Sequence, residues 1–303
     1  MQNQQPNYKF YPTLLDAYQR MVDTTTEDFL YQSEDGKWHK NWNEEEGTLH
    51  YSDEEVAVLL RRDLIDRINR VPTEPSEAAS KGTAFNMIID SLVKHSKQVE
   101  EGQMLVTIKD EECWKEACEA YTKLYEGKEI DATLASRIGQ PFILAVVDGF
   151  VFCFDIAFCR EAAEYFKGCI CQYFTKGMIE TSKGLVELYG YIDYLNENRV
   201  YDAKTTKSYT FGNYQKYWQR FAYPYTLIES EMMNEVSSFE FTVFVLAGGG
   251  PRTPLIHGSQ YKEVYTYDHE MAKRMLTQQC ERFIEFLEAN RHLITNRKIF
   301  GLE

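Results

Sequence analysis

Two aspartates and a lysine stand close together in two short, strand-like runs, GYID and DAKTT. Side chains on a strand alternate between faces, so Asp202 and Lys204 are expected to point the same way across Ala203. Asp193 ends the preceding run, and an antiparallel hairpin would bring its carboxylate near that of Asp202. Two carboxylates on one face repel each other unless a cation lies between them. Such oxygen donors suit Mg²⁺ or Mn²⁺, and an adjacent lysine can hold or deprotonate a water.

The same three residues have a simpler interpretation. Asp193 and Asp202 could be polar residues that flank a turn, and Lys204 could be a lysine that protects an edge strand. An isolated D-x-K pattern does not distinguish the two interpretations, so the surrounding sequence has to be considered.

The segment that follows favours a nucleic-acid site. No Asp or Glu occurs between Ala203 and Ile228, whereas basic and aromatic residues alternate there. Basic side chains bind phosphates and flat rings stack on bases. A helix predicted over residues 214–235 would place Gln215, Gln219 and Tyr223 on one face. The nucleic-acid-binding candidates are Thr205, Thr206, Lys207, Gln215, Lys216 and Arg220. The alternative is a buried aromatic face beside a solvated basic one.

These residues need a sheet and helices to position them. Alternating runs predict strands at 169–180, 185–195 and 199–206, and a buried strand at 239–247. Residues 141–158 are expected to form a hairpin that turns at Asp148-Gly149. Residues 104–126 are expected to be a strand followed by a helix. Helices are expected at 8–23, 52–70, 81–95, 159–166 and 268–290, with a surface loop or mobile insert at 32–49. The order predicts an α/β fold with a mixed sheet.

Composition limits the class of protein. The 303 residues carry 33 Lys+Arg against 47 Asp+Glu, a net charge of -14, which argues against a surface that coats nucleic acid everywhere. No leader pattern or membrane span is visible, so we expect an intracellular, cytoplasmic protein without a membrane partner. The seven cysteines are expected to be free thiols, with Cys169-x-Cys171 as a weak alternative for half of a metal site.

Taken in order, the motifs resemble a known superfamily. The runs GYID (190–193), DAKTT (202–206) and QRFAY (219–223) are similar to the G-x-x-D, (D/E)-x-K and Q-x-x-x-Y series of PD-(D/E)XK nucleases, most of all to the RecB-like branch and to phage-type exonucleases such as RecE. KGTAFNMIID (81–90) resembles that branch's first helix, written G-x-x-x-H-x-x-x-E. FYPTLLDAY (10–18) loosely resembles its S-x-S-x-L-x-x-Y segment.

The resemblance implies a fold and a set of roles. The fold would be a restriction-endonuclease-like core, a central mixed β-sheet flanked by helices, over residues 81–303, with an N-terminal helical extension over 1–80. Asp193, Asp202 and the backbone carbonyl of Ala203 would bind the metal. Lys204 would orient or activate the attacking water. Gln219 and Tyr223 would hold the lysine or the DNA backbone.

The chain also departs from the family pattern. Asn86 replaces the family histidine and Asp90 its glutamate, so the metal would bind loosely or depend on Asp90. Pro224 follows Tyr223 and is expected to end or kink the helix there. Only Cys280 follows the Gln/Tyr motif, so no iron–sulfur cluster is expected.

The leading hypothesis is a Mg²⁺- or Mn²⁺-dependent DNA nuclease, an exonuclease of phage or DNA-recombination type. The resemblance also admits a homo-oligomer and a recombination partner protein. The alternative is a nuclease fold without catalysis that serves as a nucleic-acid-binding or assembly module.

Overall fold

The structure is a computed structural model that describes residues 5–33, 37–45, 47–96 and 99–302. Its helices are α1 (Pro12–Asp23), α2 (Asp53–Ile68), α3 (Glu77–Val93), α4 (Glu111–Leu124), α5 (Leu134–Ile138), α6 (Ile156–Tyr165), α7 (Gln219–Glu229) and α8 (His269–Ala289), followed by two short 3₁₀ turns, η1 (Arg291–Leu293) and η2 (Arg297–Phe300).

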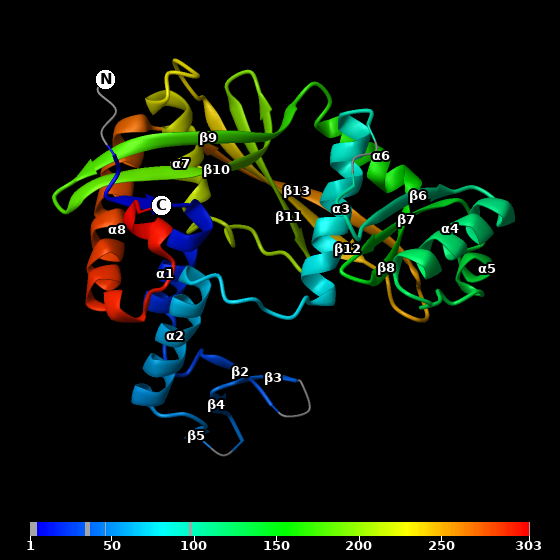
Figure 1. The fold of residues 1–303 in the computed structure, drawn as a ribbon, viewed down its shortest axis with the longest axis horizontal. Coiled ribbons are helices and arrows are strands. Elements are labelled where there is room, and N and C mark those ends of the chain that lie inside the picture. The colour runs from blue at the N-terminus through cyan, green and yellow to red at the C-terminus, as the bar shows by residue number, and fades with distance from the viewer. Residues whose placement is uncertain (1–4, 34–36, 46, 97–98, 303) are drawn as a thin grey trace.

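One large sheet runs through the molecule (Figure 1). Its strands are β1 (Tyr8–Phe10), β6 (Met104–Ile108), β7 (Phe142–Val147), β8 (Phe150–Asp155), β9 (Ile170–Thr181), β10 (Gly184–Asn196), β11 (Arg199–Thr206), β12 (Ser238–Ala247) and β13 (Leu255–Thr266). The spatial order is β1-β10-β11-β12-β13-β8-β7-β6, with β9 also paired to β10. The pairs β1–β10, β11–β12 and β13–β8 are parallel and the others antiparallel. The predicted mixed sheet flanked by helices is therefore confirmed.

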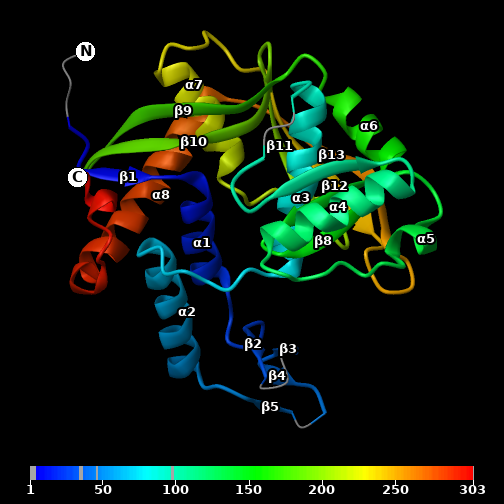
Figure 2. The same cartoon turned by 45° about the vertical axis from the view of Figure 1, so that its right-hand side comes forward.

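Helices cover the sheet in two groups (Figure 2). The first group, α1, α7 and α8, packs on β9 and β10 through apolar side chains that include Phe10, Leu188 and Phe283. In the second group, α3 and α6 pack on β7, β8 and β11, while α4 covers the opposite side of β6 and β7. Every residue of β7 is buried, because helices cover both of its faces.

Local sequence signals account for several of these elements. Ser52 and Glu55 form a reciprocal capping box that starts α2 where it was expected. Asp148 and Gly149, with φ of 53° and 80°, make the predicted two-residue turn between β7 and β8. The predicted strands of the 169–206 meander and the strand at 239–247 are confirmed as β9, β10, β11 and β12.

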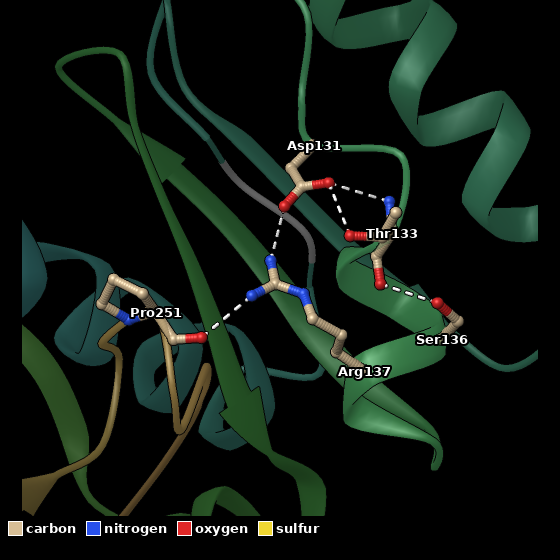
Figure 3. Close-up of polar contacts among 5 residues, drawn as sticks. All are labelled: Asp131, Thr133, Ser136, Arg137 and Pro251. Carbon is tan, nitrogen blue, oxygen red and sulfur yellow. Dashed lines mark hydrogen bonds and ion pairs between the residues drawn. The ribbon is translucent and has the colours of Figure 1, made fainter.

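A cluster on α5 joins two segments that are distant in sequence (Figure 3). The guanidinium of Arg137 donates to Asp131 at 2.5 Å and to the carbonyl of Pro251 at 2.9 Å. Asp131 also accepts from the backbone and the hydroxyl of Thr133. The cluster therefore ties the β12–β13 connection to the far end of the sheet, away from the motifs that suggested chemistry.

The predicted N-terminal helical extension begins with a strand, β1, that joins the main sheet. β1 pairs in parallel with β10, and α1 packs on α7 and α8, so residues 8–23 belong to the main core. The segment 32–49 contains short ladders instead of a plain loop: β2 (Leu30–Gln32) with β3 (Trp38–Lys40), and β4 (Trp42–Asn43) with β5 (Thr48–Leu49). Residues 34–36 and 46 of that prediction lie outside the described residues. The fully buried Asn41 holds these ladders to Thr26 and Tyr51.

The predicted helix over 214–235 is wrong at its start and its end. α7 begins at Gln219, so Gln215 lies in a turn and shares no helix face with Gln219 and Tyr223. Pro224 neither ends nor visibly divides the helix, which continues to Glu229. Tyr223 and Tyr225, on either side of Pro224, are buried. Their packing outweighs the tendency of the residue before a proline to leave the helical conformation.

Two further results bear on the expectations from composition. All seven cysteines are unpaired, and Cys153, Cys159 and Cys280 are buried. None of the helices in the described ranges combines the length and apolar character needed to cross a bilayer.

Candidate active site

The candidate site lies at an interruption in the pairing of β10. β9 pairs with one edge of β10 over residues 184–195, except at Asp193. On the other edge, β1 pairs with residues 186–188 and β11 with residues 194–196. Residues 189–193 therefore have no strand beside them on that edge. Asp193 stands at the end of this interval, next to Tyr194, where the pairing of β10 with β11 begins.

The strands also change the direction of their side chains at this point. Leu188 and Ile192 of β10 face the core formed with α1, α7 and α8. Tyr194, two residues later, faces the opposite side, where its ring stacks on Phe166 at 3.8 Å. In β9, Gln172 has a φ of 54°, which is uncommon for a residue other than glycine. Its amide Nε2 donates to Oδ1 of Asp193 at 3.3 Å. No sequence motif pointed to Gln172 as a site residue.

Asp202, Lys204 and Gln219 form a closed, buried network. Lys204 Nζ lies 2.6 Å from Oδ2 of Asp202 and donates to Oε1 of Gln219 at 2.8 Å. Gln219 Nε2 donates to Oδ1 of Asp202 at 2.6 Å. Asp202 and Gln219 are 2% and 4% exposed, so water does not screen these contacts. The structure thus brings together three of the residues singled out from the sequence.

Asp193 joins this network through the backbone. Its Oδ2 accepts from the N–H of Ala203 at 2.9 Å. If the β10–β11 ladder continued, this N–H would instead donate to a backbone carbonyl of β10. Asp193 lies one step beyond the last paired residues, Tyr194 and Tyr201, which places it across from Asp202. In a strand the N–H and C=O of one residue point to the same side, so the carbonyl of Ala203 also faces Asp193.

The electrostatics follow from two carboxylates and one ammonium group in a buried place. Burial, reinforced by the charge of Asp202, raises the pKa of Asp193 to about 7. Burial also raises the pKa of Asp202, against the opposing effect of Lys204. For Lys204, burial acts to lower the pKa, but the carboxylates of Asp202, Asp193 and Asp16 outweigh it and the pKa is raised. The single positive charge of Lys204 does not balance the negative charges of the carboxylates. A bound cation would balance the remaining negative charge.

Helix α3 brings Asn86 and Asp90 to the other side of the same strands. Gly82, Asn86 and Asp90 recur every fourth residue and share one helix face. Gly82 touches β11 so closely that a Cβ there would lie 2.6 Å from the hydroxyl of Thr205. Asp90 accepts from the hydroxyl of Tyr194 on β10 at 2.8 Å. Asn86 lies between these two contacts, and its Oδ1 is buried without a hydrogen-bond partner among the described residues.

These donors fit a hard divalent cation. Mg²⁺ is commonly bound by one or two carboxylates and keeps several waters, so a set of two aspartates with carbonyl and amide oxygens is sufficient. The unpartnered Oδ1 of Asn86 is an oxygen of the required kind. Within the described ranges, however, no group of three or more His, Cys, Asp or Glu side chains is arranged to hold a metal.

Tyr223 lies one turn after Gln219 and contacts the unpaired interval of β10. A Cβ at Gly190 would lie 2.9 Å from the Tyr223 ring, so only glycine allows this close approach. Tyr223 is buried, and burial together with Asp202 raises the pKa of its hydroxyl. The GYID and QRFAY motifs therefore meet through Gly190 and Tyr223.

The predicted nucleic-acid-binding residues are only partly brought together. Lys216 is exposed and lines a cavity of about 450 Å³ that Lys204 and Gln219 also line. Gln215 and Arg220 line a neighbouring cavity, but the Arg220 guanidinium lies over the Phe221 and Tyr265 rings, at 4.2 and 4.6 Å. Thr205 faces α3, Thr206 donates to the carbonyl of Ser208, and Lys207 is exposed.

Asp16 on α1 is a further acidic residue of this cavity. Its Oδ1 accepts from the N–H of Trp218 at 2.6 Å, so it caps the start of α7, and its Oδ2 is buried without a hydrogen-bond partner among the described residues. Burial, opposed by the Trp218 N–H, raises its pKa to about 7. Sequence reasoning missed Asp16, although the other eight residues of FYPTLLDAY are uncharged, which was an available signal.

Replacing Asp16 with asparagine is expected to stabilise the protein more at high pH than at low pH. A raised folded-state pKa means that the folded protein keeps the proton between about pH 4 and about pH 7, whereas the unfolded chain releases it. The contribution of wild-type Asp16 to stability therefore falls as pH rises through that window. The advantage of Asp16→Asn should grow by roughly 2–4 kcal/mol over the same window.

Urea unfolding of the wild type and of Asp16→Asn at several pH values measures this growth. Replacement of the exposed Asp63 on α2 by asparagine is the matched control. An advantage that does not change with pH would contradict a buried, proton-holding Asp16.

Comparisons with known proteins were made for the whole chain. No protein-family model and no curated protein matches it. Among solved structures, it is similar to the crystal structure of SSO0001, with 12% identity and a TM-score of 0.25, covering 37% of this chain and half (50%) of that one. It is also similar to a candidate exonuclease from Eubacterium rectale, with 12% identity and a TM-score of 0.35, covering 76% of this chain and 74% of that one. These similarities are too distant to assign a family.

Proposed function

We propose that the protein is a metal-dependent nuclease that hydrolyses phosphodiester bonds in DNA, an exonuclease of phage or recombination type with a PD-(D/E)XK site. The observation that carries the proposal is the buried network of Asp202, Lys204 and Gln219, beside Asp193, at the interrupted edge of β10. A structural ion pair needs one carboxylate and one ammonium group. Here Asp193 adds a second carboxylate, which accepts from Ala203 and Gln172, and Asn86 adds an amide oxygen that has no hydrogen-bond partner among the described residues.

The residues that would hold the cation are Asp193, Asp202 and the carbonyl of Ala203, with Asn86 and Asp90 on α3. When bound, Mg²⁺ or Mn²⁺ supplies positive charge that offsets the charge developing on the phosphate oxygens. Tyr194 donates to Oδ1 of Asp90 and so orients this carboxylate. The remaining chemistry belongs to side chains of this chain.

Lys204 is placed to orient the attacking water. An ammonium group has three N–H donors, and Asp202 and Gln219 take two of them. The third is free to donate to a water or to a phosphate oxygen. Gln219 fixes the lysine because it accepts from Nζ and donates to Asp202 at the same time. In phosphoryl chemistry the protein is expected to contribute by positioning the reacting groups and by stabilising the charge that develops on the phosphate.

The charge distribution agrees with a substrate that enters at one place. The protein has a net charge of -14, so most of its surface repels a polyanion. Four basic side chains line the cavity beside Lys204, against three acidic ones, so its described lining is weakly positive: Arg20, Arg67, Lys204 and Lys216 against Asp16, Asp23 and Asp28. A DNA end would therefore be held best where the candidate site opens.

A second candidate function is a non-catalytic nuclease fold that binds nucleic acid or assembles with a partner. Two observations favour it: Asn86 replaces a stronger ligand, and Lys204 already neutralises Asp202 at 2.6 Å. Metal binding separates the two candidates. Calorimetric titration with Mn²⁺ should show one site in the wild type that is lost in Asp193→Asn, and a flat wild-type titration would favour the non-catalytic module.

Cleavage of an end-labelled linear duplex tests the proposal directly. The wild type is expected to degrade the duplex in Mg²⁺ and to stop when a chelator is added, because the charge on the phosphate is then uncompensated. Asp202→Asn is expected to be inactive under both conditions. Equal degradation by the wild type and Asp202→Asn, or degradation that persists in chelator, would overturn the proposal.

A further inference from the structure

A second cavity, of about 1160 Å³, opens at the unpaired interval of β10. Gly190 and Tyr223 line it, and so does Thr13 at the start of α1, which also lines the cavity beside Lys204. The two cavities share Thr13, and α7 lines one through Tyr223 and the other through Gln219, one turn away. Nothing in the sequence motifs pointed to this second cavity.

The lining of this cavity is basic in a protein that is acidic as a whole. Lys9, Arg70, Lys176 and Lys298 line it, against one acidic residue, Glu187. Lys9 and Lys176 approach Glu187 at 3.7 and 3.9 Å. Arg70 and Lys298 are exposed and form no ion pair within the described part of the chain. The cavity therefore presents a net positive charge of three at its rim.

Two exposed aromatic rings stand beside these charges. Phe174 and Tyr191 are cross-strand neighbours on β9 and β10, with ring centroids 5.2 Å apart, and they are 47% and 58% exposed. Both line the cavity. Exposed rings next to phosphate-binding charges are the arrangement that holds an unstacked nucleic-acid strand. The bases of a duplex cannot use such rings, because neighbouring bases already cover their faces.

We propose that this groove, formed by Arg70, Phe174, Lys176, Tyr191 and Lys298, binds single-stranded nucleic acid beside the catalytic network. The proposal deepens the nuclease function proposed above and rests on it for its biological role. Positive charge would hold the phosphates, and Phe174 and Tyr191 would stack on bases. Tyr223, which lines the groove, and Gln219, one turn away on α7, would connect the groove with the cavity beside Lys204. A strand separated from its complement is the substrate class that fits.

Binding in the absence of metal tests the groove independently of cleavage. The probe is a fluorescein-labelled oligothymidylate of about twelve nucleotides, a length within the range that one single-strand-binding OB fold covers. Its binding is measured by fluorescence anisotropy in the presence of a chelator. Phe174→Ala/Tyr191→Ala is expected to weaken binding about 5- to 100-fold, the loss that follows from removing base stacking. Arg70→Ala/Lys298→Ala is expected to weaken it too and to reduce the slope of log affinity against log salt by about 1.4.

Matched controls keep the test specific. Trp38→Ala removes a ring that is 67% exposed on β3, and Lys115→Ala removes a charge that is exposed on α4. Both are expected to bind the probe as the wild type does. Blunt duplex binding should be unchanged in Phe174→Ala/Tyr191→Ala. Thermal unfolding would verify that the variants, all at exposed positions, remain folded.

The outcomes separate this proposal from the proposed function. Oligothymidylate affinity that is equal in the wild type and the groove variants overturns the groove assignment, even if the protein cleaves DNA. A wild type that does not bind the probe overturns it as well. Selective loss in the groove variants supports it, even if no cleavage is found. Equal loss for duplex and single strand would contradict the preference for unstacked bases.

Discussion

Replacing Lys204 with arginine is expected to lower the rate of duplex hydrolysis by about 100- to 10,000-fold while the protein stays folded and still binds Mn²⁺. Arginine keeps the positive charge that Asp193 and Asp202 require, so the fold and the carboxylates should be preserved. It replaces one compact nitrogen with a planar fork, which cannot place a single donor between Asp202, Gln219 and a water. The cavity beside Lys204 has room for the larger side chain.

Single-turnover cleavage of an end-labelled duplex, together with Mn²⁺ titration, measures both parts of this prediction. The control is Lys115→Arg, an exposed lysine on α4 that is 70% accessible and whose one ion pair among the described residues is with Glu111 in the same helix. Cleavage by Lys204→Arg at the wild-type rate would remove Lys204 from the chemistry. Loss of Mn²⁺ binding in the same variant would instead show that the lysine positions the carboxylates.

Local rules were enough to predict the parts of the site that lie on a single element. The two-residue repeat of a strand put Asp202 and Lys204 on one face, and the 2.6 Å contact confirms it. The Asp148-Gly149 turn, the start of α2 near Ser52 and the four-residue spacing of Asn86 and Asp90 are of the same kind. Each depends on neighbours within about four residues, which a sequence shows directly.

The parts that the sequence did not reveal depend on contacts between distant segments. α7 starts at Gln219 because Asp16, from α1, accepts from the N–H of Trp218, and no local N-cap rule includes a residue from another helix. The acid-free segment before α7 is likewise held by Glu263 of β13, which accepts from Tyr209 and Gly212. Glu263, which is 1% exposed and remote in sequence, thus supplies the negative charge that the segment before α7 itself lacks.

The interrupted edge of β10 is the largest feature that pattern reasoning could not predict. Strand periodicity predicted that β10 and β11 exist. It did not predict that β1 would pair with the first part of the β10 edge that β11 also uses. The open interval exists because β1 ends at Phe10 and because β11 leaves β10 after Tyr201, while it continues beside β12 to Thr206. Gln172 and Asp16, the two site residues that were missed, both lie on elements that meet the motifs only through this arrangement.

The ion pair itself should dominate the stability of the site. Lys204→Met leaves Asp202 buried without its compensating charge, and loss of one partner of a buried pair costs about 3–5 kcal/mol. Adding Asp202→Asn removes the uncompensated charge, so the double variant Asp202→Asn/Lys204→Met is expected to recover most of that loss. Urea unfolding at neutral pH gives the free energy of unfolding of each variant, and the double-mutant cycle gives the coupling between the two residues.

The exposed pair Asp23–Lys216, 3.3 Å apart beside the same cavity, is the matched control. Its cycle should give a coupling of about 0.2–1 kcal/mol, because water screens both partners. The stabilised double variant is still expected to be inactive on DNA, since it lacks both a metal ligand and the orienting ammonium group. A double variant no more stable than Lys204→Met would mean that the network is held by packing and not by charge compensation. Activity in the double variant would mean that hydrolysis takes place elsewhere on the molecule.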